Sequence, residues 1–377
     1  MMPLQEFLEK SFAVSPREFG FLVSAYAFSA FAASMTASFF VDRFDRKKVL
    51  LLAFSGLIVG TISCGLANSY TMLMVARIIA GLFGGLISAQ ALSIVGDIFL
   101  YQKRGRAMGL LMSGFSAAAI AGVPIALFVA TKTNWQIPFI GIGILGIILL
   151  PIAFVVLPKM QGHIKSADER NSILVYQSVW KDRNKQYALL MMLTLIFAHF
   201  STIPFIAPYL EKNVGFTKEQ LPLMYFFGGA MSLFSSPLIG KLSDKFGKHK
   251  IFTIFLLLAI IPVFLLTNLP RVPFSYVLIV TTLFFILASG RMVPAQALIA
   301  SVVPPNLRGG FMNLNASLQQ LGLGIASFIG GIIITKNAAG ELQHYNIVGY
   351  MSIAVSLICL AIMWQVRAVQ ITQTDKI

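Results

Sequence analysis

A short charged motif occurs twice in this chain, and it constrains the fold more than any other feature. Residues 38–48 read SFFVDRFDRKK and residues 240–250 read GKLSDKFGKHK, an offset of 202 residues (240 minus 38). Each copy lies between two apolar runs that are long enough to cross a bilayer as helices. Two similar halves in one orientation are typical of transporters built from parallel repeats.

The composition excludes a soluble domain. Hydrophobic residues make up 57% of the chain and charged residues 11%, whereas soluble domains carry about 25% charged residues. The two cysteines, Cys64 and Cys359, lie in apolar runs of different halves, which indicates neither a disulfide framework nor a metal site. None of the four histidines has the spacing of metal ligands, so we expect no cofactor, no metal and no enzyme activity.

Eleven apolar runs are each long enough for one helical crossing. They are residues 18–41, 49–67, 72–96, 107–130, 137–157, 188–210, 220–240, 251–268, 274–302, 311–335 and 346–366. Before them stands a short segment, Met1 to Leu8, which the repeat offset aligns with the end of the 188–210 run. We therefore expect most of a further, first helix to be missing from the front of the chain.

Lysine and arginine are distributed unevenly over the loops. Alternate loops on one side hold 20 of them and the opposite loops hold seven, while Arg77 and Arg291 inside apolar runs complete the 29. Because cytoplasmic loops are enriched in basic residues, the first set is predicted to be cytoplasmic, with the C-terminus inside a bacterial inner membrane. The net charge of +15 is then a topology signal, and nucleic-acid binding is not expected.

The second copy of the motif resembles the major facilitator superfamily. The family's loop between its second and third helices, repeated between the eighth and ninth, reads G-x-x-x-D-R/K-x-G-R/K-R/K. Gly240, Asp244, Lys245, Gly247 and Lys248 match this pattern in order. The next residue is a histidine where the pattern has arginine or lysine. This resemblance covers essentially the whole chain.

The first copy departs from the family pattern at two glycines. Ser38 and Asp45 stand in their places. Aspartate is among the few residues that tolerate a left-handed turn, so we expect Asp45 not to break the loop. The resemblance implies an all-α membrane protein, a major-facilitator-type bundle of two six-helix halves. Its expected parts are an N-terminal half (1–158), a cytoplasmic central loop (159–186), a C-terminal half (187–366) and a cytoplasmic tail (367–377).

The resemblance also implies a cytoplasmic gate formed by the doubled motif. Asp42 would face the positive start of the 311–335 helix near Arg308, and Asp97 would pair with Arg43 or Arg46. The second copy would place Asp244 near Arg104, and it has no acid equivalent to Asp97. The expected gate residues are Asp42, Arg43, Arg46, Asp97, Asp244, Lys245, Lys248 and Arg308.

Arg77 lies inside the 72–96 run, where a cation costs about 2.5–3.5 kcal/mol on insertion scales and is a functional hypothesis by default. Snorkelling to the outer surface is the alternative, since Arg77 lies close to that end. The spacing resembles the fourth-helix motif of proton-coupled facilitators, whose arginine interacts with an acid of the first helix. All fourteen carboxylates of this chain fall in loops or at helix ends, so that acid would lie in the missing helix.

Other polar residues within the runs are candidates for a central cavity. His199 could carry a proton, or it could be a satisfied packing residue. Arg291 lies deeper than Arg77, which favours a cavity or gate role over snorkelling. For the remaining ones, hydrogen bonding between helices is an equal alternative to substrate contact. The full set of cavity and coupling candidates is Tyr26, Arg77, Gln90, His199, Arg291, Gln296, Asn315 and Gln319.

Four small or helix-bending residues are expected to shape the packing. Gly81 and Gly85 form a small-xxx-small face that lets another helix approach closely. Gly122 and Pro124 resemble part of the fifth-helix motif of antiporters, G-x-x-x-G-P-x-x-G-G. The match is degraded because a valine separates the two residues.

The resemblance implies proton-driven export, by rocking of the two halves, of a small neutral or lipophilic organic molecule, drug-like or sugar-like. Ion-coupled uptake is the runner-up, and a sensor or scaffold without transport is a third hypothesis because of the missing helix. The expected partners are a small-molecule substrate and the lipid bilayer, and we expect a monomer.

The loop charges predict which positions an impermeant reagent can reach. Single cysteines introduced at positions 165 and 248 should be protected from a maleimide added outside whole cells, because both loops belong to the basic set. A cysteine at position 213 should react. Labelling at 248 from outside would reverse the predicted orientation.

Overall fold

The computed structural model describes residues 1–40, 44–98, 114, 117–160, 170–217, 219–304 and 308–367. The first part contains the short 3₁₀ helix η1 (Met2–Leu4), α1 (Gln5–Phe12), α2 (Pro16–Phe40), α3 (Arg46–Gly65), α4 (Tyr70–Ile98), the π-helix η3 (Ala118–Gly122), α6 (Val123–Lys132) and α7 (Gln136–Val156). The second part contains α9 (Arg170–Lys181), α10 (Arg183–Phe200), α11 (Ile203–Tyr209), the π-helix η4 (Leu210–Val214), α12 (Gln220–Phe246), α13 (Lys248–Thr267), α14 (Phe274–Ala300), α15 (Arg308–Ile333), β1 (Thr335–Lys336), β2 (Leu342–Gln343) and α16 (Tyr345–Met363).

Ten helical segments in the described residues are long and apolar enough to span a membrane. Most of their bounds agree with the predicted runs to within a few residues, because run length and hydropathy set where a membrane helix can begin and end. The predicted 107–130 run is described only in its later part, where Ala118–Lys132 forms a shorter apolar helix. The all-α membrane fold predicted from the sequence is therefore confirmed.

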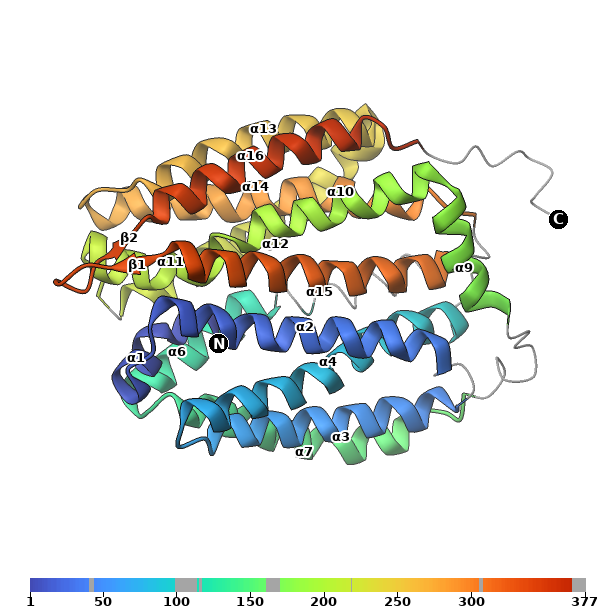
Figure 1. The fold of residues 1–377 in the computed structure, drawn as a ribbon, viewed down its shortest axis with the longest axis horizontal. Helices are drawn as coiled ribbons and strands as arrows, with labels where there is room; N and C mark the ends of the chain where they lie inside the picture. Colours follow the sequence, from blue (N-terminus) through green and yellow to red (C-terminus); the bar gives the residue numbers. More distant parts are fainter. Residues whose placement is uncertain are drawn as a thin grey trace.

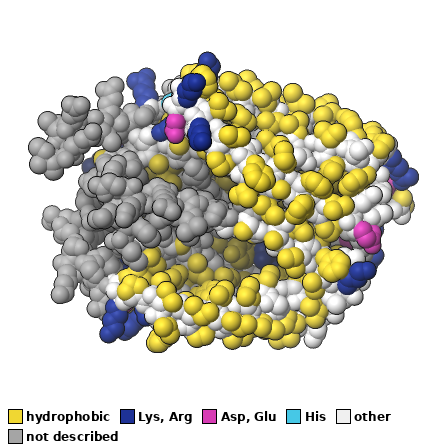
Figure 2. All heavy atoms as spheres, turned by 180° about the vertical axis from the view of Figure 1, so that it is seen from behind, with side chains coloured by type: hydrophobic (Ala, Val, Ile, Leu, Met, Phe, Trp, Pro, Cys, Tyr) yellow, Lys and Arg dark blue, Asp and Glu magenta, His cyan; other side chains and the backbone are white. Residues whose placement is uncertain are grey.

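The helices lie side by side as an elongated bundle with an apolar outer surface. Helices α2, α3, α4, α6 and α7 form one side, and α10 and α12 to α16 form the other (Figure 1). Figure 2 shows hydrophobic side chains over the middle of the surface and basic side chains mostly toward its ends. Helix α7 is an example of this apolar outer surface. It is the most apolar of the described spans and is mostly unburied, as a lipid-facing helix is.

The predicted 188–210 run is not one continuous helix. Helix α10 ends at Phe200, and α11 begins at Ile203 after a turn at Ser201 and Thr202. Pro204 stands in the first turn of α11, where its missing N–H removes no hydrogen bond within that helix. The whole segment still counts as one span, Arg183–Val214.

Side chains of α16 satisfy the backbone at this break. The Tyr345 hydroxyl donates to the carbonyl oxygen of Thr202 at 3.0 Å, and the Ser352 hydroxyl donates to that of Ala198. Non-helical backbone at membrane depth is stable only where protein or water supplies such partners. The broken helix is therefore fixed to α16.

The two sides of the bundle approach most closely where α2 begins and α15 ends. A Cβ atom on Gly20 would lie 2.7 Å from the carbonyl oxygen of Ser327 and 2.9 Å from Cα of Gly331. Next to this contact, the rings of Phe21 and Phe328 stack with centroids 5.0 Å apart. Only glycine permits such an approach of two backbones.

Ion pairs join the two sides at the same end of the bundle, which carries the β1–β2 hairpin (Figure 1). Lys212 Nζ lies 3.7 Å from a carboxylate oxygen of Glu6, and Lys336 pairs with Glu9. Asn213 anchors the hairpin through hydrogen bonds to Leu342, one donated by its amide to the carbonyl oxygen and one accepted from the N–H, both 2.9 Å. This end is therefore closed by packing and by charge.

Replacing Gly20 with alanine should destabilise the chain, because the new methyl group overlaps the backbone of α15. Overpacking of this kind costs about 1–3 kcal/mol. The matched control is Gly141→Ala in α7, where a Cβ atom would meet nothing within 4 Å. We expect a lower thermal unfolding midpoint for Gly20→Ala and an unchanged or higher one for the control. Equal midpoints would contradict the close approach.

Candidate functional site

Arg77 lies between α2 and α4 and does not extend out of the bundle. Its guanidinium carbon sits 4.5 Å from the centroid of the Tyr26 ring, and its Nε donates to the carbonyl oxygen of Leu22 at 3.4 Å. A cation over an aromatic face is attracted by the ring quadrupole, most strongly where water is excluded. The structure thus brings together two predicted cavity residues, Tyr26 and Arg77, that are 51 positions apart (77 minus 26).

Three glycines of α4 make room for this arrangement. A Cβ atom on Gly81 would lie 2.4 Å from the Tyr26 carbonyl oxygen, and one on Gly85 would lie 2.3 Å from that of Ala30. A Cβ atom on Gly84 would lie 2.3 Å from the Tyr26 hydroxyl oxygen. The sequence singled out Gly81 and Gly85 as a packing face, and the role of Gly84 became visible only with the position of Tyr26.

Gly122 and Pro124 occupy the junction of η3 and α6. Gly122 ends the π-helix, and Pro124 stands in the first turn of α6. A Cβ atom on Gly122 would meet only the side chain of Ala118, at 3.7 Å, which is an ordinary contact. Among the described residues this glycine therefore serves no close helix approach.

Arg291 and His199 form a second polar pair, within the C-terminal helices. Arg291 Nη2 lies 3.0 Å from His199 Nδ1. A guanidinium has only donors, so Nδ1 is the acceptor and carries no proton in this arrangement. The imidazole also stacks on Phe284, with ring centroids 5.7 Å apart. Sequence reasoning selected both residues but could not pair them across 92 positions.

The four carboxamide candidates differ in burial. Gln90 is 2% exposed and Asn315 is 1% exposed, whereas Gln296 and Gln319 are partly buried. Gln90 Oε1 and both side-chain polar atoms of Asn315 have no hydrogen-bond partner among the described residues. Helices α4 and α15, which carry Gln90 and Asn315, pack against each other. Buried amides without partners have unused capacity to bind a ligand or water.

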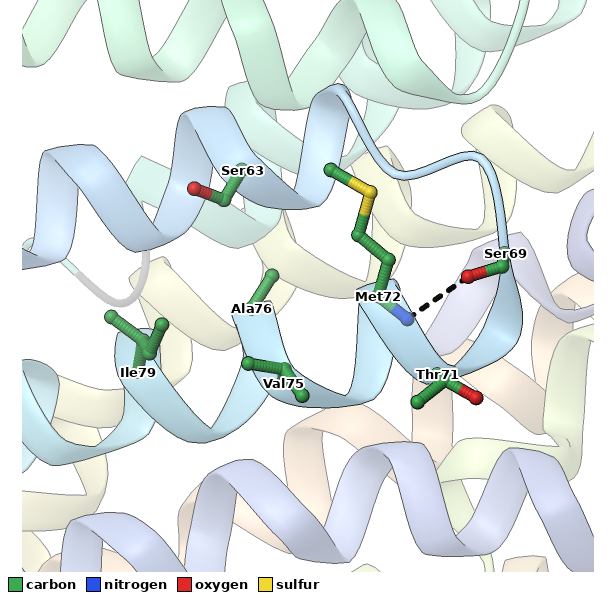
Figure 3. A pocket seen from close by; sticks show the side chains of 7 residues that line it. All are labelled: Ser63, Ser69, Thr71, Met72, Val75, Ala76 and Ile79. Atoms are coloured by element: carbon green, nitrogen blue, oxygen red, sulfur yellow. Dashed lines mark hydrogen bonds between the residues drawn. The ribbon is translucent and has the colours of Figure 1, made fainter.

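A cavity of about 500 Å³ lies between α3 and α4, away from these residues (Figure 3). Met72 and Val75 in its lining are 42% and 50% exposed, so it opens toward the outer surface. Its α4 residues lie on the opposite side of that helix from Arg77, since Val75 and Ile79 are two positions before and after it. The lining residues are Ser63, Ser69, Thr71, Met72, Val75, Ala76 and Ile79.

The predicted gate is only partly described. Asp42 and Arg43 lie outside the described residues. Helix α4 includes Asp97 and α15 includes Arg308, but their side chains also fall outside the description. The pairings predicted for these four residues stay predictions.

The two copies of the loop motif turn in different ways. Gly247 has φ +91°, which is a left-handed backbone conformation. Asp45 has φ −59°, so this residue does not use the left-handed conformation that aspartate tolerates. Instead, the Asp45 side chain caps α3 by accepting from the N–H of Lys47 at 2.9 Å, and it also accepts from the N–H of Met160 at 3.3 Å. The buried Arg46 donates its backbone N–H to the Met160 carbonyl oxygen.

The second copy is more open to solvent. Asp244 and Lys245 are exposed in the last turn of α12. Asp244 has no ion-pair partner among the described residues, and its predicted partner Arg104 lies outside them. Lys248 donates from Nζ to the carbonyl oxygen of Ala297 at 3.5 Å. In the described part of the chain, the first copy of the motif is thus the more buried of the two.

Comparison with known proteins places this arrangement in a family. The family model described as "Major Facilitator Superfamily" matches residues 1–286 and 188–374. The chain is 26% identical over 351 residues to the "Uncharacterized MFS-type transporter YceJ" of Bacillus subtilis, covering 92% of this chain and 87% of that protein. It is 24% identical over 340 residues to a "Probable sugar efflux transporter" of Helicobacter pylori, covering 86% and 85%.

Solved structures show the same fold at low sequence identity. The crystal structure of a D-xylose-proton symporter has a TM-score of 0.76 at 16% identity, covering 97% of this chain and 93% of that one. A bacterial homologue of the human lysosomal transporter Spinster, in an inward-facing and occupied conformation, has a TM-score of 0.74 at 16% identity, covering 96% and 91%. The family match spans both motif copies and all ten described spans, so the chain belongs to the Major Facilitator Superfamily.

Proposed function

We propose that this transporter exports a small neutral or lipophilic organic molecule, drug-like or sugar-like, in exchange for protons. The observation that carries the proposal is the contact of the partly buried Arg77 with α2, because a cation held at one ring face within the membrane is suited to respond to a proton nearby. Similarity to the Helicobacter pylori sugar efflux transporters supports export and a sugar-like substrate.

The proposal extends to the organisation of the chain. Residues 1–158 and 187–366 act as two halves that rock about the substrate, with 159–186 as their cytoplasmic connection. The protein is a monomer in a bacterial inner membrane with its C-terminus inside. The substrate cavity is formed by Tyr26, Arg77, Gln90, His199, Arg291, Gln296, Asn315 and Gln319.

Transport into proteoliposomes separates export from uptake. An antiporter accumulates substrate when the lumen is acidic, because protons leave as substrate enters, whichever way the protein is inserted. A symporter accumulates substrate when the lumen is alkaline. With chloramphenicol and isopropyl thiogalactoside as neutral probes, we expect accumulation with an acidic lumen, which Arg77→Gln abolishes. Accumulation only with an alkaline lumen would establish uptake, and accumulation of neither probe with either gradient would contradict proton-driven export of such neutral compounds.

The geometry around Arg77 predicts a pair of variants that compensate for each other. Gly84→Ala should impair gradient-driven transport, because its methyl group overlaps the Tyr26 hydroxyl and moves the ring from the guanidinium. Tyr26→Phe alone should transport well, since the ring face remains, whereas Tyr26→Leu should lose about tenfold, in line with a desolvated cation–π contact of about 1.4 kcal/mol.

The double variant Gly84→Ala with Tyr26→Phe tests the geometry directly. Removing the hydroxyl leaves the ring carbon Cζ as the nearest atom, 3.1 Å from the new methyl group, which a small shift can relieve. We expect initial rates of proton-driven uptake to recover toward those of Tyr26→Phe. A double variant as inactive as Gly84→Ala would count against the proposed role of Tyr26.

A further inference from the structure

Arg291 lies deep in the membrane-spanning part of α14. At 1.5 Å per residue it is about 25 Å from the end at Phe274 and about 14 Å from the end at Ala300. Its side chain is 1% exposed, so it cannot reach either membrane surface. Burial at this depth removes water as a partner for the guanidinium.

No carboxylate of the described C-terminal helices lies near this depth. The sequences of α10, α13, α14, α15 and α16 contain neither aspartate nor glutamate. Helix α12 has one acid, Asp244, and it is exposed in the last turn. The positive charge of Arg291 is therefore not balanced by these helices, which is a costly arrangement inside a membrane.

His199 gives Arg291 a hydrogen-bond acceptor but no negative charge. The bond from Nη2 to Nδ1 uses one of five guanidinium N–H groups, and Arg291 Nε is buried with no partner among the described residues. His199 is partly exposed, whereas Arg291 is buried. Of the two side chains, the imidazole is therefore the one that a ligand can reach without a rearrangement of the site.

We propose that Arg291 and His199 form an anion site that takes the carboxylate of an organic acid. The two carboxylate oxygens accept two N–H bonds from the guanidinium, and the acid replaces the imidazole as its partner. This inference rests on the proposed function, because it narrows the lipophilic substrate to one that carries an acid group. The Phe284 ring, stacked on His199, gives the site an aromatic wall.

Arg77 is a contrasting case within the same chain. Its guanidinium already has the face of Tyr26 and the carbonyl oxygen of Leu22 as partners on α2. In the described part of the chain, the hydrogen-bond partner of the Arg291 guanidinium is one neutral nitrogen, Nδ1 of His199. The two arginines thus differ in how much of their charge remains to be compensated, and Arg291 is the one suited to an anionic ligand.

The test compares benzoate with benzamide, which have nearly the same size and shape and differ in charge. Thermal unfolding of the purified full chain in detergent is followed over a range of each compound, and apparent dissociation constants are taken from the midpoint shifts. We expect benzoate to bind about tenfold or more tightly than benzamide. Arg291→Gln should abolish this preference, and Arg291→Lys should weaken it because lysine lacks the planar fork.

The control is Arg271→Gln, which removes an exposed arginine that lies 3.4 Å from Glu341, and it should keep the preference for benzoate. Equal binding of the two compounds, binding of neither, or an unchanged preference in Arg291→Gln would overturn the proposal. If Arg291→Gln does not fold, the comparison in the parent chain and in Arg291→Lys decides. The assay uses no pH gradient, so a failure of proton-driven export would leave its result intact.

Discussion

An apolar membrane supplies no hydrogen-bond partner, and the whole structure depends on this constraint. The described spans satisfy their backbone groups as helices, and the one break, between α10 and α11, is satisfied by Tyr345 and Ser352 of α16. Charges obey the same rule. Arg77 is held by an aromatic face and a carbonyl oxygen, whereas the partner of Arg291 among the described residues is the neutral His199.

The helices could be predicted from the sequence because hydropathy and run length are local properties. The 49–67 run, for example, became α3 at Arg46–Gly65. The break after Phe200 could not, since Pro204 was its only local sign and the side chains that stabilise it lie about 150 positions later. The conformation of Asp45 could not be predicted either, because its side chain caps α3 with an ordinary backbone conformation in place of the left-handed one that aspartate tolerates.

In the candidate site, too, local features could be predicted from the sequence and contacts between distant residues could not. Polar residues in apolar runs could be selected from the sequence, because each is costly in a membrane. Their partners could not, since Tyr26 meets Arg77, and His199 meets Arg291, only through the packing of helices distant in sequence. Gly84, one of several glycines in α4, was not among the predicted packing residues. Its importance follows from the Tyr26 hydroxyl that occupies the space beside it.

The hydrogen bonds between α16 and the break after α10 restrict how the C-terminal helices can move. Two hydrogen bonds from α16 end on backbone carbonyl oxygens at the break, one at Ala198 in α10 and one at Thr202 in the turn. A hinge at this point would have to give up one of these two bonds between helices, although each carbonyl oxygen keeps a local donor, the Ser201 hydroxyl for Ala198 and the Phe205 N–H for Thr202. The least costly motion therefore carries α10, α11 and α16 together. The break is then a fixed kink in the C-terminal helices and not a hinge.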